Sequence, residues 1–82
     1  METQHWNTEK DYLTRTVQLN NFVEVVELIN KITIPAEEMN HHPDLRVYDY
    51  KFLEIKLSSH SEGRVTEADH KLAEQINLLI LG

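Results

Sequence analysis

The sequence contains no cysteine, which excludes disulfide bonds and thiolate chemistry. The absence of disulfides fits a reducing compartment. No apolar run approaches the roughly 20 residues that a membrane-spanning helix needs. The first ten residues, METQHWNTEK, lack the basic region and apolar stretch of a secretory signal. We therefore expect a cytoplasmic protein with no membrane partner.

Glycine and proline are scarce, with two of each, and this leaves little room for linkers. The 82 residues show no repeat and no low-complexity segment, so we expect one domain over residues 1–82. A domain of this size buries only about 60–65% of its unfolded surface. Because small cores often gain stability by association, we expect a homodimer or homotetramer.

Acidic residues outnumber basic ones by 14 to 8, which gives a formal net charge of −6. This charge repels a phosphate backbone and argues against direct binding of nucleic acid. Charged residues make up 27% of the chain and hydrophobic residues 40%, values that are typical of a folded domain.

Alternating side chains predict four strands. Residues 4–8 and 12–19 read as two strands with a turn at 7–11, although Arg15 interrupts the apolar face of the second. Residues 44–60 read as a hairpin that turns near 49–51.

A helix is predicted after an N-cap at Asn20 or Asn21. Pro35 interrupts its apolar pattern, and we expect a kink there because the pattern keeps its phase afterwards. Its apolar stripe comprises Phe22, Val25, Val26, Ile29, Ile32, Ala36 and Met39.

A second helix is predicted after Thr66, which with Asp69 resembles a capping box. The order strand, strand, helix, strand, strand, helix predicts an α+β fold. In this fold a four-stranded antiparallel sheet carries two main helices on one face. The other face of the sheet is then solvated or used for association.

Three of the five histidines are candidate site residues. His41 and His42 stand where the long helix should end, before Pro43, and His60 ends the second strand of the following hairpin. Since a hairpin returns its far end toward its start, the three imidazoles can meet at one edge of the sheet. Imidazole titrates near neutral pH, so such a cluster suits acid–base chemistry on a polar heterocycle.

Plainer interpretations of these residues stay open. The His41–His42 pair fits a solvated helix C-terminus, where a positive charge meets the helix dipole favourably. Three histidines can also bind zinc, but adjacent residues seldom reach one ion together, so we predict no metal site. Asp69 either supports the first turn of its helix or orients His60 or a ligand. The remaining histidines, His5 and His70, lack supporting context and are expected at the surface.

Residues 36–43, A-E-E-M-N-H-H-P, resemble the central signature of the pterin-4a-carbinolamine dehydratases. Residues 57–60, L-S-S-H, and 66–73, T-E-A-D-H-K-L-A, match two further motifs of that family in the right order. Weaker similarity to the family at Trp6, 13–16 and Phe22 extends the resemblance over about residues 5–77. The family usually begins with an additional helix, which we expect to be absent here.

The resemblance implies dehydration of 4a-hydroxytetrahydropterin to quinonoid dihydropterin, the recycling step for tetrahydrobiopterin. It implies that His41 and His60 act as general acids and that His42 binds and orients the pterin with some acid–base role. Pro43 and Asp69 belong to the expected substrate site. No metal or organic cofactor is required.

Two other functions remain open. Some members of the family also serve as dimerisation partners of a transcription factor, so a non-catalytic scaffold is the alternative from a different class. The same imidazoles would also serve for another pterin, such as one on the molybdenum-cofactor pathway.

Overall fold

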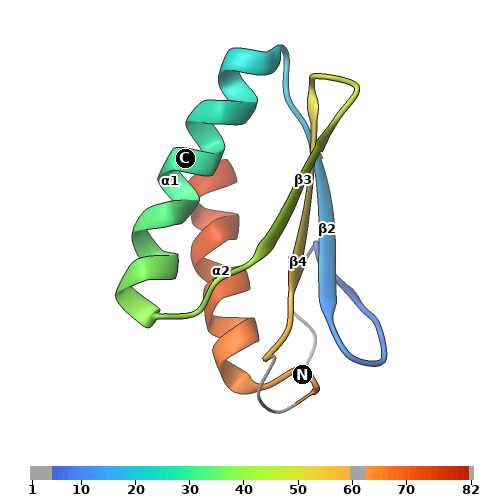
Figure 1. Ribbon diagram of the computed structural model, residues 1–82, viewed down its shortest axis with the longest axis vertical. Coiled ribbons are helices and arrows are strands. Elements are labelled where there is room, and N and C mark those ends of the chain that lie inside the picture. The colour runs from blue at the N-terminus through green and yellow to red at the C-terminus, as the bar shows by residue number, and fades with distance from the viewer. Residues whose placement is uncertain (1–4, 60–62, 82) are drawn as a thin grey trace.

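The computed structural model describes residues 5–59 and 63–81, apart from the side chain of residue 81. The elements follow the order β1 (Asn7–Thr8), β2 (Leu13–Gln18), α1 (Phe22–Met39), β3 (Asp44–Tyr48), β4 (Phe52–Leu57) and α2 (Glu67–Leu81). Both helices cover the same face of one antiparallel sheet, and they lie side by side (Figure 1). This is the predicted α+β fold.

The strand order in the sheet is β1-β2-β4-β3, so β2 and β4 are central. Leu13 of β2 pairs with Leu57 of β4, and Gln18 pairs with Phe52. The β3–β4 hairpin turns at residues 49–51, as the sequence predicts. The first strand is shorter than predicted, because residues 5 and 6 precede it and only Asn7 and Thr8 pair with β2.

Helix α1 begins after Asn21, whose side chain accepts a hydrogen bond from the backbone N–H of Glu24. It runs through Pro35 without ending there, as expected from the phase of its apolar pattern. Pro35 is itself buried, so its ring contributes to the packing that holds this part of the helix.

The face of α1 that is buried overlaps the predicted stripe but is shifted at its edge. Phe22 and Val26 are 54% and 39% exposed, whereas Leu28 is 6% exposed. Val25, Ile32 and Ala36 of the predicted stripe are buried, and Leu28 joins them on the buried face. The helical repeat predicts most of the buried face. The contacts with the sheet and α2 decide which residues at its edge are buried.

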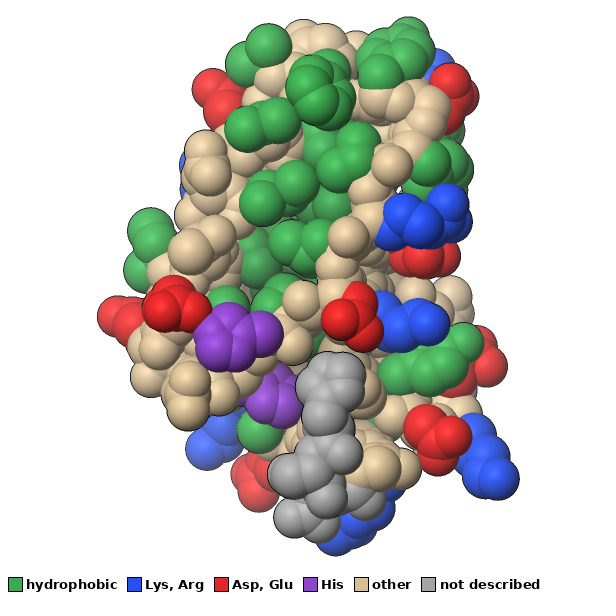
Figure 2. Space-filling model, viewed as in Figure 1, with side chains coloured by type: hydrophobic (Ala, Val, Ile, Leu, Met, Phe, Trp, Pro, Cys, Tyr) green, Lys and Arg blue, Asp and Glu red, His purple; other side chains and the backbone are tan. Residues whose placement is uncertain are grey.

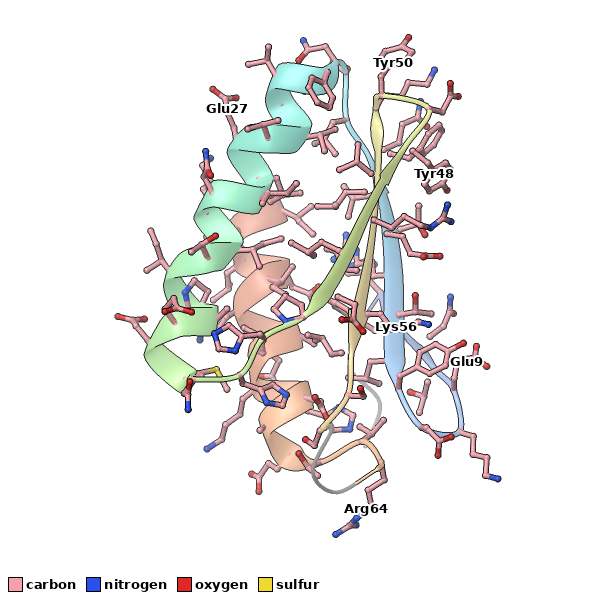
Figure 3. All side chains as sticks on the ribbon, in the orientation of Figure 1. Glu9, Glu27, Tyr48, Tyr50, Lys56 and Arg64 are labelled. Carbon is pink, nitrogen blue, oxygen red and sulfur yellow. The ribbon has the colours of Figure 1, made fainter. Side chains whose placement is uncertain are left out.

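The core lies between the sheet and the two helices. Its strand residues alternate along β4, where Leu53, Ile55 and Leu57 are fully buried. The open face of the sheet is polar and aromatic, and Tyr48 projects there, away from the helices (Figure 3). No helix in residues 5–59 and 63–81 is long and apolar enough to span a membrane. The residues that form the hydrophobic core are Trp6, Leu13, Val17, Val25, Leu28, Ile32, Leu53, Ile55, Leu57, Leu72, Ala73 and Ile76.

Candidate active site

The end of α1 holds His41 in place through its backbone. Asn40 adopts the left-handed conformation, with φ 50° and ψ 44°. Its N–H donates to the carbonyl of Glu37 at 3.1 Å, and the N–H of His41 donates to the carbonyl of Ala36 at 2.9 Å. These two bonds form a Schellman motif, which ends the helix and sets the direction of the following chain. The position of His41 is therefore fixed by the helix terminus.

Asp69 stands in the first turn of α2 and is fully buried. Its Oδ2 accepts a hydrogen bond from the backbone N–H of Thr66 at 2.8 Å. This is one half of the predicted capping box. The side chain of Thr66 does not complete the box, because its Oγ1 lies 2.6 Å from Oγ of Ser59 instead.

The imidazole of His41 meets the buried carboxyl group of Asp69. Nε2 of His41 lies 2.5 Å from Oδ1 of Asp69, and the histidine side chain is 17% exposed. The two residues are 28 positions apart in the chain, so packing of α2 beside the end of α1 creates the pair. A histidine that is oriented by a carboxylate and remains partly open to solvent has the form of a general acid or base.

Ser59 completes the buried polar group. It is 7% exposed, and its hydroxyl donates to Oδ2 of Asp69 at 3.1 Å. An isolated bridge to Arg64 holds the backbone of Ser59, whose N–H donates to the carbonyl of Arg64 at 3.2 Å. Ser59 lies in the L-S-S-H motif at residues 57–60, but the sequence motif did not predict a role for it.

His42 lies in a different setting from His41. Its Nε2 is 2.5 Å from Oε2 of Glu37, and the two side chains are 58% and 67% exposed. His42 and Pro43 line a small pocket of about 130 Å³ between α1 and the start of β3, with Leu45 on its wall. Histidine side chains gather on this side of the molecule (Figure 2). The structure thus brings the predicted residues 41, 42, 43 and 69 to one end of α1.

The sequence also leads to predictions for His60, His5 and His70. His60, the third member of the predicted cluster, lies outside the described residues. His5 is exposed, as expected for a surface residue. His70 is only partly exposed and has an interaction partner.

A larger groove of about 750 Å³ separates the outer sides of α1 and α2. Glu38, Glu67 and Lys71 contribute to its walls, and none of the described residues that line it is a histidine. Acid–base chemistry near neutral pH therefore points to the His41–Asp69 pair rather than to this groove. Residues 5–59 and 63–81 contain no group of three or more histidine or acidic side chains arranged to hold a metal ion.

Comparison with known proteins identifies the family. A family model described as pterin 4 alpha carbinolamine dehydratase matches residues 1–79. The chain belongs to this family. The resemblance found in the sequence motifs is thereby confirmed over almost the whole chain.

The matches to relatives in this family also cover most of each relative's own length. A protein of Sulfolobus acidocaldarius, named "Putative pterin-4-alpha-carbinolamine dehydratase", is 49% identical over 76 residues, which are 93% of this chain and 82% of that one. A protein of Trichodesmium erythraeum with the same name is 40% identical over 72 residues, covering 88% of this chain and 76% of its own.

Solved structures share the fold. A transcriptional coactivator/pterin dehydratase from Brucella melitensis matches with a TM-score of 0.86 and 26% identity, over 94% of this chain and 83% of that one. A pterin dehydratase-like protein identified as a RuBisCO assembly factor matches with a TM-score of 0.71 and 14% identity, over 95% and 89%. At that identity the second match concerns the fold alone.

Proposed function

We propose that this chain dehydrates 4a-hydroxytetrahydropterins to quinonoid dihydropterins, as a step in the recycling of tetrahydrobiopterin. The observation that carries the proposal is the contact of the partly exposed His41 imidazole with the fully buried carboxyl group of Asp69. Membership of the pterin-4a-carbinolamine dehydratase family supports the choice of substrate.

The reaction needs one proton delivered and one removed. The bond between C4a and the hydroxyl oxygen breaks, the departing oxygen takes a proton to leave as water, and a ring nitrogen loses its proton. An imidazole can donate and accept near neutral pH. We assign His41 and His60 as the acids for the departing hydroxyl, and His42 mainly to binding with some acid–base role.

Substrate binding is assigned to His42 and Pro43, with Asp69 behind His41. The pocket beside His42 has mostly apolar walls, which Ile32, Ala36 and Leu45 help to form. A flat heterocycle can pack against such walls while the exposed imidazole reaches its polar edge. Both carboxyl oxygens of Asp69 form hydrogen bonds with protein groups, so we assign Asp69 to orienting His41. In this assignment the reaction uses no metal or organic cofactor.

A direct test is the decay rate of synthetic 4a-hydroxytetrahydropterin in the presence of wild type, His41→Asn and His60→Asn. An asparagine amide at 41 keeps a polar side chain but cannot exchange a proton. General acid–base catalysis is worth about 10²–10⁴-fold, so a loss in that range is expected for each variant. The matched control is His5→Asn, which changes an exposed histidine that has no assigned role.

The control variant should keep the wild-type rate, and circular dichroism should show that each variant is folded. Equal rates for wild type and a His41→Asn, His60→Asn double variant would remove the catalytic proposal. A panel of pterins, including one from the molybdenum-cofactor pathway, would then show by titration whether the site prefers another head group.

A non-catalytic scaffold is the second candidate function, and the paired name of the Brucella melitensis protein motivates it. A specific partner captured equally by wild type and by a chain lacking His41, His42 and His60 would favour this function. A chain that captures no partner and dehydrates the pterin would count against it.

We also propose that the protein is a cytoplasmic homodimer or homotetramer. Hydrophobic side chains gather on one face over α1 and the β3–β4 hairpin (Figure 2). In these elements Phe22, Val23 and Tyr50 are 54%, 65% and 57% exposed. Association would remove this apolar surface from water. Analytical ultracentrifugation would measure the oligomeric state, and a monomer at every concentration would contradict the proposal.

A further inference from the structure

The hydroxyl groups of Ser59 and Thr66 have defined hydrogen-bond directions. The Ser59 hydroxyl donates to Oδ2 of Asp69. A hydroxyl carries a single hydrogen, so in the 2.6 Å contact between Ser59 and Thr66 the Thr66 hydroxyl must be the donor. The hydrogen bonds therefore run in one direction, from Thr66 to Ser59 to Asp69.

The same reasoning orients the His41 ring. Oδ2 of Asp69 already accepts from the Ser59 hydroxyl and from the N–H of Thr66. Two donors on one oxygen favour the ionised carboxylate, which only accepts hydrogen bonds. Nε2 of His41, at 2.5 Å from Oδ1, must then carry a hydrogen. Within the described residues no protein group forms a hydrogen bond with Nδ1 of His41.

We propose that Ser59 and Thr66 are positioning residues that act through Asp69 to hold His41 in the Nε2–H tautomer, so that it exchanges protons with its ligand through Nδ1. The tautomer follows from the hydrogen bonds alone. The exchange with a pterin rests on the proposed function. In this proposal Nδ1 of His41, and not Nε2, exchanges a proton with the ligand.

A role limited to capping α2 does not account for these contacts. The cap requires only the bond from the N–H of Thr66 to Asp69. Ser59 comes from the other side, after β4, and its hydroxyl bonds to two side chains rather than to the helix backbone. The described residues also leave no buried side-chain nitrogen or oxygen without a partner. Ser59 therefore adds to the orientation of Asp69 beyond what the cap provides.

Nuclear magnetic resonance of ¹⁵N-labelled protein can read the ring nitrogens directly. Long-range ¹H–¹⁵N correlations distinguish the two neutral tautomers and the imidazolium. In the wild type the neutral form of His41 should be the Nε2–H tautomer. Ser59→Ala should give a mixture of tautomers and lower kcat about tenfold, a loss typical of removing a group that orients a site ligand, with KM little changed. Thr66→Val should act in the same direction, and Thr66→Ser, which keeps the hydroxyl, should retain the wild-type signature.

The outcomes separate this inference from the proposed function. A wild-type His41 in the Nδ1–H tautomer would overturn the inference without any variant and whatever the activity. An unchanged tautomer and unchanged kcat in Ser59→Ala would overturn the role of Ser59. If the tautomer responds as expected but the wild type does not dehydrate a 4a-hydroxytetrahydropterin, the positioning role stands and the proposed function fails.

Discussion

Nη1 of Arg15 donates a hydrogen bond to Oδ1 of Asn77, and the two atoms lie 2.5 Å apart. Arg15 lies at a position of β2 where the alternation calls for an apolar residue, and this contact explains why a charged side chain is tolerated there. Burial lowers the pKa of Arg15 from its ordinary value. The same oxygen of Asn77 accepts from Nε1 of Trp6 at 2.8 Å. Asn77 thus links α2 to β2 and to the residue before β1.

Replacement of Asn77 by alanine should destabilise the fold, because it removes an acceptor that Trp6 and Arg15 share. Leaving a buried donor without a partner costs about 1–3 kcal/mol. Urea unfolding can be followed by the fluorescence of Trp6, which is the single tryptophan. Asn77→Asp keeps an oxygen acceptor and is the matched control. An unchanged urea midpoint in Asn77→Ala would contradict this prediction.

Protonation of Glu54 should weaken the sheet at low pH. The hydrogen bond from Arg46 and its positive charge hold the pKa of Glu54 below its ordinary value. Because the folded pKa is lower, the unfolded state binds more protons, and stability increases with pH across this interval. The contribution is therefore complete above the ordinary glutamate pKa of about 4.3 and disappears as the pH falls through the folded pKa.

The measurement compares the free energy of unfolding of wild type and Glu54→Gln between pH 7 and pH 2.5. The difference should be largest near pH 7 and should vanish at the acid end. Both partners are partly exposed, so the effect should be small and should decrease in high salt. A difference that stays constant with pH would refute the assignment.

Asn40 should tolerate glycine but not alanine. Its φ of 50° lies in the left-handed region, which costs an alanine roughly 1–2 kcal/mol. Asn40→Ala should lower the free energy of unfolding by about that amount, and Asn40→Gly should match the wild type or exceed it slightly. Both variants remove the same side chain, so their difference isolates the backbone conformation. Equal stability of the two variants would show that the helix end does not need this conformation.

Glu37→Gln should affect binding more than turnover, because Glu37 contacts the exposed His42 and not His41. Even a full ion pair at an exposed site is worth only about 0.2–1 kcal/mol, so KM for the pterin should rise at most about fivefold. Steady-state kinetics would measure the change, with Glu38→Gln as the control on the same helix. A large fall in kcat with unchanged KM would assign His42 to the chemical step instead.

Local patterns determined much of the architecture. Alternation at Leu53, Ile55 and Leu57 predicts a strand with one buried face, and all three are fully buried. The N-cap, predicted at Asn20 or Asn21 and found at Asn21, the continuation of α1 through Pro35 and the turn at 49–51 also follow from neighbouring residues. These features depend on side chains within a few positions of each other, so sequence alone suffices to predict them.

The tertiary structure decided what lies far apart in the chain. Phe22 and Val26 are exposed because packing against the sheet and α2 buries Leu28 and shifts the edge of the buried face of α1. The sequence singled out His41 and Asp69 separately, yet only the docking of α2 beside the end of α1 makes them partners, with Ser59 added from the end of β4. Residue spacing encodes which face of an element is apolar. It does not encode which distant side chain that face contacts, because this depends on how the helices and the sheet pack against each other.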